Sequence, residues 1–151
     1  MCNGFSTRTT RGGAIAILRP FESQSENYYQ VTLEEVPGTP TGCAGRISLP
    51  VGTEETKRDG HMQALKSCWL QIHRDGDLVP RGVRDTIPTL HKFPMDKLVW
   101  QTESRSTEAS TGNMLGPISL TVGNEGVIGR RMSIMDGESG IRVAEGVIGW
   151  N

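Results

Sequence analysis

The sequence predicts an all-β protein, an eight-stranded barrel or sandwich formed by one domain. Short segments in which apolar and polar residues alternate are typical of half-buried strands. Turn-forming residues separate them, since the 151 residues include 19 Gly and 8 Pro,. No segment keeps a helical period, so we expect no helix of three or more turns within residues 27–151.

Eight strands are expected in the barrel domain, which we assign to residues 27–151. They lie at residues 28–34, 45–51, 61–67, 69–74, 97–103, 106–111, 131–135 and 141–149. Residues 76–94 contain three prolines and are predicted to form a long loop, and residues 116–126 a loop with an apolar plug,. Residues 1–26 are interpreted as an N-terminal extension, a docking arm, with a short apolar run at residues 14–18.

The core is expected to come from alternating apolar positions of the first strands. We expect only part of this set to be buried, because residues of opposite parity cannot all face inward unless a strand is covered on both faces. The candidates are Val31, Leu33, Ile47, Leu49, Leu70 and Ile72.

The overall charge argues against two classes of partner. A formal net charge of −1 gives no basic excess for nucleic acid or an anionic membrane surface,. The chain also has no apolar run of the roughly 18 residues that a membrane span needs. We therefore predict no nucleic acid partner and no membrane span.

The three cysteines, Cys2, Cys43 and Cys68, predict an intracellular, reducing compartment,. An odd number of scattered cysteines is no disulfide framework, and their spacing is not that of a zinc site. Cytoplasm or a virion is the preferred location. The alternative is the mitochondrion, because Arg8, Arg11 and Arg19 stand in an N-terminal segment without acidic residues up to that point, which resembles a presequence,.

Four motifs carry a resemblance to a known family. The segments ISL (118–120), VIGR (127–130) and RVAEGVIG (142–149) resemble the closing strands of copper/zinc superoxide dismutases. WLQIHRDGD (69–77) resembles the histidine-bearing strand and turn of that family. The motifs lie in the family's order, and the resemblance covers residues 27–151, for which it implies an eight-stranded Greek-key barrel. A plainer reading is that GVIG is any buried strand whose glycines allow close backbone approach.

The resemblance also implies that the metal site is lost. The family binds copper and zinc with six histidines and an aspartate, whereas this chain has three histidines, namely His61, His73 and His91. Gln71 and Met135 occupy positions where the family has copper ligands, and an amide is a poor copper ligand. We therefore expect no cofactor, no bound metal and no dismutase activity.

Three residues remain as remnants of the site, namely His73, His91 and Arg142. Each histidine is either a weak copper ligand or a packed core residue, and the second reading is preferred. Arg142 matches the family's anion-binding arginine, and without a metal we expect it to bind a backbone carbonyl or a carboxylate. His61 is expected to be exposed. Glu145 stands where the family's intrasubunit disulfide would need a cysteine.

The resemblance implies a contact surface, because VIGR and the GVIG tail lie at the dimer interface of the family. The predicted interface residues are Val127, Ile128, Gly129, Val147, Ile148, Gly149 and Trp150. The function this implies is that of a catalytically inactive structural or partner-binding subunit, in a homodimer or larger complex. In this it resembles inactive poxviral homologues and the dismutase-like domains of copper chaperones. The alternatives are a residual copper-binding, weakly redox-active protein and an unrelated β-sandwich of virion type.

Overall fold

The computed structural model describes residues 12–21, 28–38, 42–49, 55–78, 88–103, 106–110 and 117–151. These residues form mostly β-structure, with one α-helix, α1 (Glu55–Lys66), and one 3-10 turn, η1 (Met95–Lys97). The strands are β1 (Gly13–Pro20), β2 (Tyr29–Glu35), β3 (Cys43–Ser48), β4 (Cys68–His73), β5 (Thr89–Pro94), β6 (Val99–Glu103), β7 (Ser106–Ser110), β8 (Arg131–Asp136) and β9 (Arg142–Trp150).

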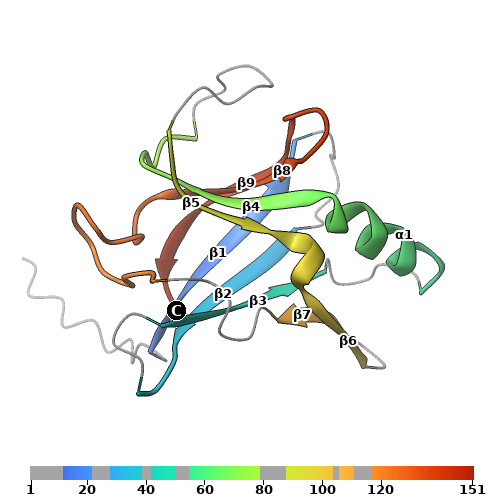
Figure 1. Ribbon diagram of the computed structural model, residues 1–151, viewed down its shortest axis with the longest axis horizontal. Helices are drawn as coiled ribbons and strands as arrows, with labels where there is room; N and C mark the ends of the chain where they lie inside the picture. The colour runs from blue at the N-terminus through green and yellow to red at the C-terminus, as the bar shows by residue number, and fades with distance from the viewer. Residues whose placement is uncertain are drawn as a thin grey trace, which may run out of the picture.

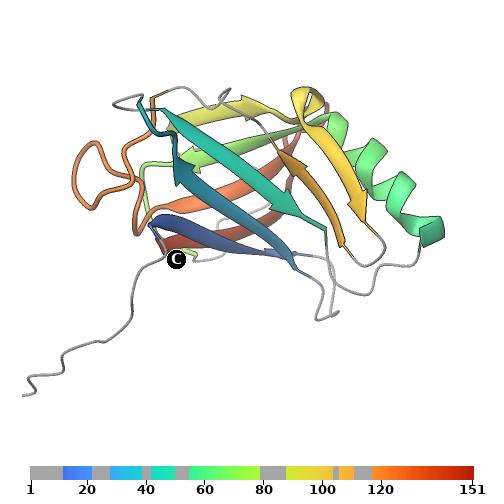
Figure 2. The same cartoon turned by 90° about the horizontal axis from the view of Figure 1, so that it is seen from below.

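The strands pair in the order β5-β4-β8-β9-β1-β2-β3-β7-β6, and every pair is antiparallel. The sheet curls into a half-barrel, so that its two halves face each other (Figures 1 and 2). Its outer strands, β5 and β6, follow each other in sequence and are joined through η1. Within the described residues the sheet thus has nine strands rather than the eight predicted.

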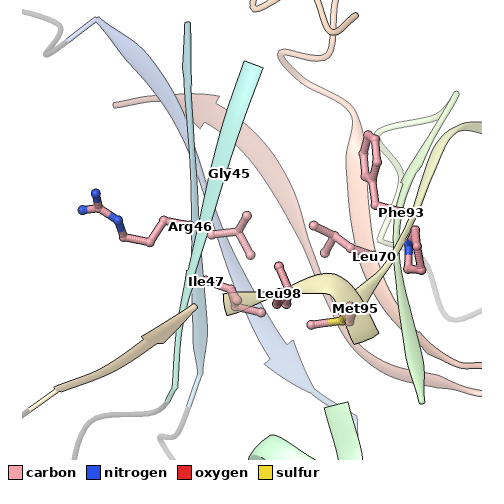
Figure 3. A pocket seen from close by; sticks show the side chains of 9 residues that line it. Gly45, Arg46, Ile47, Leu70, Phe93, Met95 and Leu98 are labelled. Carbon is pink, nitrogen blue, oxygen red and sulfur yellow. The ribbon is translucent and has the colours of Figure 1, made fainter. Parts of the chain in front are cut away.

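The core fills the inside of the curl. All six residues predicted for it are buried. The expectation that some would fail was wrong, because each strand sets its own parity: Val31 pairs with Ile47, and Leu70 pairs with Ile134,. Figure 3 shows Leu70 and Met95 on the opposite side of a small apolar cavity, about 20 Å³, from Ile47.

Strand β1 was assigned to the extension, but the structure places it inside the sheet. It pairs with β2 on one side and with β9 on the other. Ala14, Ala16 and Leu18 are fully buried. An apolar run this short is consistent with a strand, a helix or a loop. It forms a strand here because β2 and β9 offer hydrogen-bond partners on both of its sides. The other residues of the predicted extension that lie within 1–11 and 22–26 are outside the described residues.

Residues 61–67 were predicted to be a strand, and this was wrong, as was the expectation of no helix of three turns. They lie largely in α1, whose 12 residues exceed three turns,. Leu65 is buried and Met62 packs against the core, at the i, i+3 spacing of one helix face,. The helix packs beside β4 and η1 (Figures 1 and 2). The prediction failed because so short a segment fits both the two-residue period of a strand and the 3.6-residue period of a helix.

Strand β5 falls in the predicted loop 76–94, so the loop prediction was wrong for this segment. The strand pairs only with β4 and is an edge of the sheet. Proline is tolerated at an edge, because one row of backbone donors has no partner there, and Pro94 ends the strand opposite Trp69. The other predicted strands correspond to β2, β3, β4, β6, β7, β8 and β9, although residues 50–51 and 111 lie outside the described residues.

The close approach of β9 to β1 gives a test of this fold. A Cβ atom at Gly146 would overlap the carbonyl oxygen of Ile17, whereas one at Gly149 would meet no atom within 4 Å. We expect Gly146→Ala to lower the free energy of unfolding by about 2 kcal/mol, and Gly149→Ala to change it little. Urea unfolding measures both, and equal effects would contradict the β1–β9 register.

Candidate functional site

The outer face of β4, β8 and β9 carries polar residues where the inner face carries the core. Gln71, Ser133 and Glu145 lie directly opposite one another across these three strands. Because neighbouring side chains alternate between faces, Ile72 and Ile134 point into the core instead,. Although it is outside the curl, this face is covered, since Ser133 is 0% and Glu145 8% exposed.

Two arginines and two carboxylates form a charge cluster on this face, made up of Asp75, Arg131, Arg142 and Glu145. Arg131 donates from Nη2 to Asp75 Oδ1 at 3.2 Å and from Nη1 to Glu145 Oε2 at 3.2 Å. Arg142 donates from Nη1 to the same Glu145 oxygen at 2.9 Å. The charges of these four residues cancel. Pairing of this kind is what permits charged groups to be buried.

His73 forms a second buried pair beside the charge cluster. Its Nε2 lies 2.9 Å from Ser133 Oγ, and both residues are 0% exposed. A histidine and a serine at this distance could form a nucleophilic dyad if a substrate could reach them. Complete burial removes that access. This agrees with the preferred prediction that His73 is a packed residue.

The other residues that the resemblance placed at the metal site lie on two different faces of the sheet. Gln71 lies opposite Ser133 and Met135 opposite Trp69, so both share the outer face with Ser133. His91 lies opposite Ile72, a core residue, and stacks on Phe93 with ring centroids 6.2 Å apart. Its pKa is lowered, mainly by burial and also by the nearby arginines.

The structure therefore does not bring His91 to His73. Within the described ranges, no group of three or more His, Cys, Asp and Glu side chains could hold a metal ion. Arg142 binds the carboxylate of Glu145, one of the two kinds of partner predicted for it. His61 was expected at the start of an exposed strand; it lies instead on α1 and is partly buried.

The two predicted interface segments meet, as expected. Gly129 donates its backbone N–H to the carbonyl of Ile148 at 2.8 Å, and Ile148 donates back to Arg130 at 2.9 Å. Arg130 fixes the preceding turn, because its Nη2 donates to the carbonyls of Gly123 and Asn124 at 3.0 and 2.8 Å. They do not meet at an edge of the sheet, however, since β9 lies between β8 and β1.

Only part of the predicted interface is open to contact. Val127 and Ile148 are core residues, exposed by 0% and 1%, whereas Val147 is 38% and Trp150 53% exposed. Val147 and Trp150 are three residues apart on β9, so they point to opposite sides of the strand. A partner that touches both must therefore reach around the end of β9.

The sequence analysis did not predict Asp75, Arg131 or Ser133 as site residues. It named Glu145 only as the position at which the family has a disulfide cysteine. A signal was present, because Arg131 and Ser133 alternate with apolar residues of a strand that was itself predicted. What could not be read from the sequence is that the outer face would be buried. Burial turns an ordinary polar face into one whose charges must be paired.

None of the helices in the described part of the chain is long and apolar enough to cross a membrane. No protein-family model matches this chain, and no curated protein matches it. Its function must therefore be inferred from its own residues and geometry.

The charge cluster gives a second test. Glu145→Gln leaves Arg131 and Arg142 sharing one carboxylate fewer in a buried site, so we expect the free energy of unfolding to fall by about 3 kcal/mol. Asp75→Asn is the matched control and should cost less, since the Asp75 side chain is 21% exposed and Arg131 keeps Glu145. Chemical denaturation compares the two variants. A Glu145→Gln effect no larger than that of Asp75→Asn would contradict the central role of Glu145.

Proposed function

We propose that this protein is a catalytically inactive member of the copper/zinc superoxide dismutase-like family that acts as a structural or partner-binding subunit. The observation that carries the proposal is the buried outer face of β4, β8 and β9. On this face, where the resemblance puts the metal site, Arg131 and Arg142 share Glu145, and His73 hydrogen-bonds with Ser133. These contacts bind the polar groups to one another rather than presenting them to a substrate.

The strand order supports the scaffold part of the proposal. β3 pairs with β7, and β4 pairs with β8, so strands that are far apart in the sequence lie side by side and are joined by long connections. Connections of this type are what a Greek-key barrel requires. The nine strands and α1 mean that the family's eight-stranded barrel would be modified here by an added helix and strand.

The residues present do not fit copper or zinc. Gln71 offers an amide, and Met135 offers a thioether from a strand position opposite Trp69. One ring nitrogen of His73, Nε2, lies at hydrogen-bonding distance from Ser133. His91 lies on the neighbouring strand β5, opposite the core residue Ile72, and therefore on the other face of the sheet from His73. The proposed function therefore contains no metal chemistry.

The surface that supports partner binding is formed by Ile128, Gly129, Val147, Gly149 and Trp150, which we call the β9 surface. It consists of the predicted interface residues other than Val127 and Ile148, which are buried in the core. Trp150 is the kind of aromatic side chain that dominates binding energy in interfaces. The proposed partner is a second copy of the chain or a larger complex.

A reducing intracellular compartment completes the proposal. Cys43 and Cys68 are free and buried. Burial raises the pKa of the Cys43 thiol to about 11, and it also raises that of Cys68, with the Asp136 charge adding to it. Both side chains are therefore neutral thiols at physiological pH, which behave as small apolar core residues.

The first prediction of this proposal concerns metal. Protein purified from medium supplemented with copper and zinc should contain neither in stoichiometric amount, and dismutase activity should stay at background after copper loading. Elemental analysis and a superoxide-consumption assay measure the two quantities. One tightly held copper per chain would overturn the proposal.

The second prediction concerns assembly. Trp150→Glu should dissociate the native complex, because a charge at the centre of an interface leaves an unpaired ion there. The monomer should still fold, since Trp150 is more than half exposed. Light scattering after size exclusion measures the mass, and Val99→Glu, at a 61% exposed site on β6, is the control. A complex that survives Trp150→Glu, or a chain that unfolds, contradicts the β9 surface as the interface.

A further inference from the structure

A groove of about 490 Å³ opens beside α1, at the opposite end of β9 from Trp150. Its walls come from the end of β1, the start of β2, α1, the start of β4 and the turn between β8 and β9. Three of its lining side chains belong to the core, namely Tyr29, Leu65 and Cys68. Ile141 and Val143 add apolar surface that is more open to solvent. A volume of this size is typical of sites for small organic molecules.

The hydroxyl of Tyr29 is a buried polar group of this groove that lacks a protein partner. Tyr29 is 5% exposed, and its hydroxyl makes no hydrogen bond with any residue that the structure describes. The hydroxyl oxygen is not sealed in the interior, and the open space that Tyr29 borders is the groove. The pKa of Tyr29 is raised, mainly by burial and also by Cys68, so the hydroxyl keeps its proton at neutral pH and can donate.

The charged groups on the lining are already engaged. Arg142 donates to Glu145 at 2.9 Å, and its guanidinium carbon lies 4.8 Å from the centre of the Phe21 ring. Asp136 accepts from the backbone N–H and from the hydroxyl of Ser139. An anionic ligand would therefore meet the negative charge of Asp136, while the positive charge of Arg142 is balanced by its own carboxylate.

The polar end of a ligand should therefore be uncharged. An ion that reaches Tyr29 would exchange its water shell for one neutral hydroxyl, and burial of an ion without a charged partner is costly. A neutral acceptor loses far less hydration, and the Tyr29 hydroxyl can replace the hydrogen bond that it gives up. His61 also lines the groove, but it is partly exposed on α1, so water can serve as its partner.

We propose that this groove binds a small uncharged organic molecule with an apolar body and one hydrogen-bond acceptor, such as a ketone. The acceptor takes the hydrogen bond of the Tyr29 hydroxyl, and the apolar body lies against Leu65, Ile141 and Val143. This site is independent of the proposed partner-binding function, because none of these residues belongs to the β9 surface.

The experiment titrates the full chain with 4-phenylbutan-2-one, using calorimetry and backbone NMR shifts. Two analogues carry a charge in place of the ketone: 3-phenylpropionate is an anion and 3-phenylpropylamine is a cation at neutral pH. The ketone should bind saturably, shift the signals of residues around the groove, and bind at least tenfold more tightly than either ion, because an ion pays the larger desolvation cost. No saturable binding of the ketone, or equally tight binding of either ion, overturns the proposal.

Tyr29→Phe tests the hydrogen bond. It removes only a hydroxyl that has no partner among the described residues, so the fold should be kept. The variant should bind 4-phenylbutan-2-one about fivefold more weakly, as expected for the loss of one neutral hydrogen bond. Propylbenzene, which has a similar apolar body and no acceptor, is the matched ligand and should bind both proteins equally. Ketone binding that is unchanged, or an equal loss for propylbenzene, overturns the proposal.

Two variants of α1 locate the site. Ala64→Phe fills the groove from an exposed position and should abolish binding of the ketone. Gln63→Phe is the control, since Gln63 is the exposed neighbour of Ala64 and lies outside the lining, and it should leave binding unchanged. Binding that persists in Ala64→Phe, or that Gln63→Phe weakens as much, shows that the ketone binds elsewhere and overturns the assignment.

Discussion

The pairing of β1 with β9 is the constraint on which the rest of the structure depends. It joins the half of the sheet that contains β4, β8 and β9 to the half that contains β2 and β3. The backbones can approach closely because Gly146 has no side chain to meet the carbonyl of Ile17,. With the halves joined, the curl closes around a single core. β9 also carries Arg142, Glu145 and Trp150, so both candidate functional surfaces depend on its position.

The charge cluster is the second constraint on the structure, and both a desolvation cost and an attraction between its charges contribute to its free energy. Removing several charges from water is costly, and the pairing of Arg131 and Arg142 with Glu145 offsets that cost rather than adding a large net stability. What such a cluster does provide is a fixed arrangement, because a shift of β8 against β9 would break the contact between Arg131 and Glu145. It places charged groups of opposite sign in contact on the outer face.

The two surfaces outside the cluster differ in kind. The β9 surface has Val147 and Trp150 on opposite sides of one strand end, and it suits a partner large enough to contact both,. The groove beside α1 is concave and combines apolar walls with a buried tyrosine, which suits a small molecule,. Helix α1 contributes Leu65 to the core and also lines the groove, so the helix that sequence patterns failed to predict adds a feature that the resemblance did not imply.

The sequence by itself determined the strands whose alternation is unambiguous, β2, β4, β8 and β9 among them, and with them the burial of Val31, Leu33, Leu70 and Ile72. It also determined that too few histidines are present for the family's metal site. Tertiary structure decided the segments whose local pattern fits more than one element, namely β1, β5 and α1, since a neighbouring strand or the core selects among conformations of similar local energy. It alone decided the charge cluster, because Asp75, Arg131 and Glu145 are far apart in the chain, and only their burial on one face requires that they pair,.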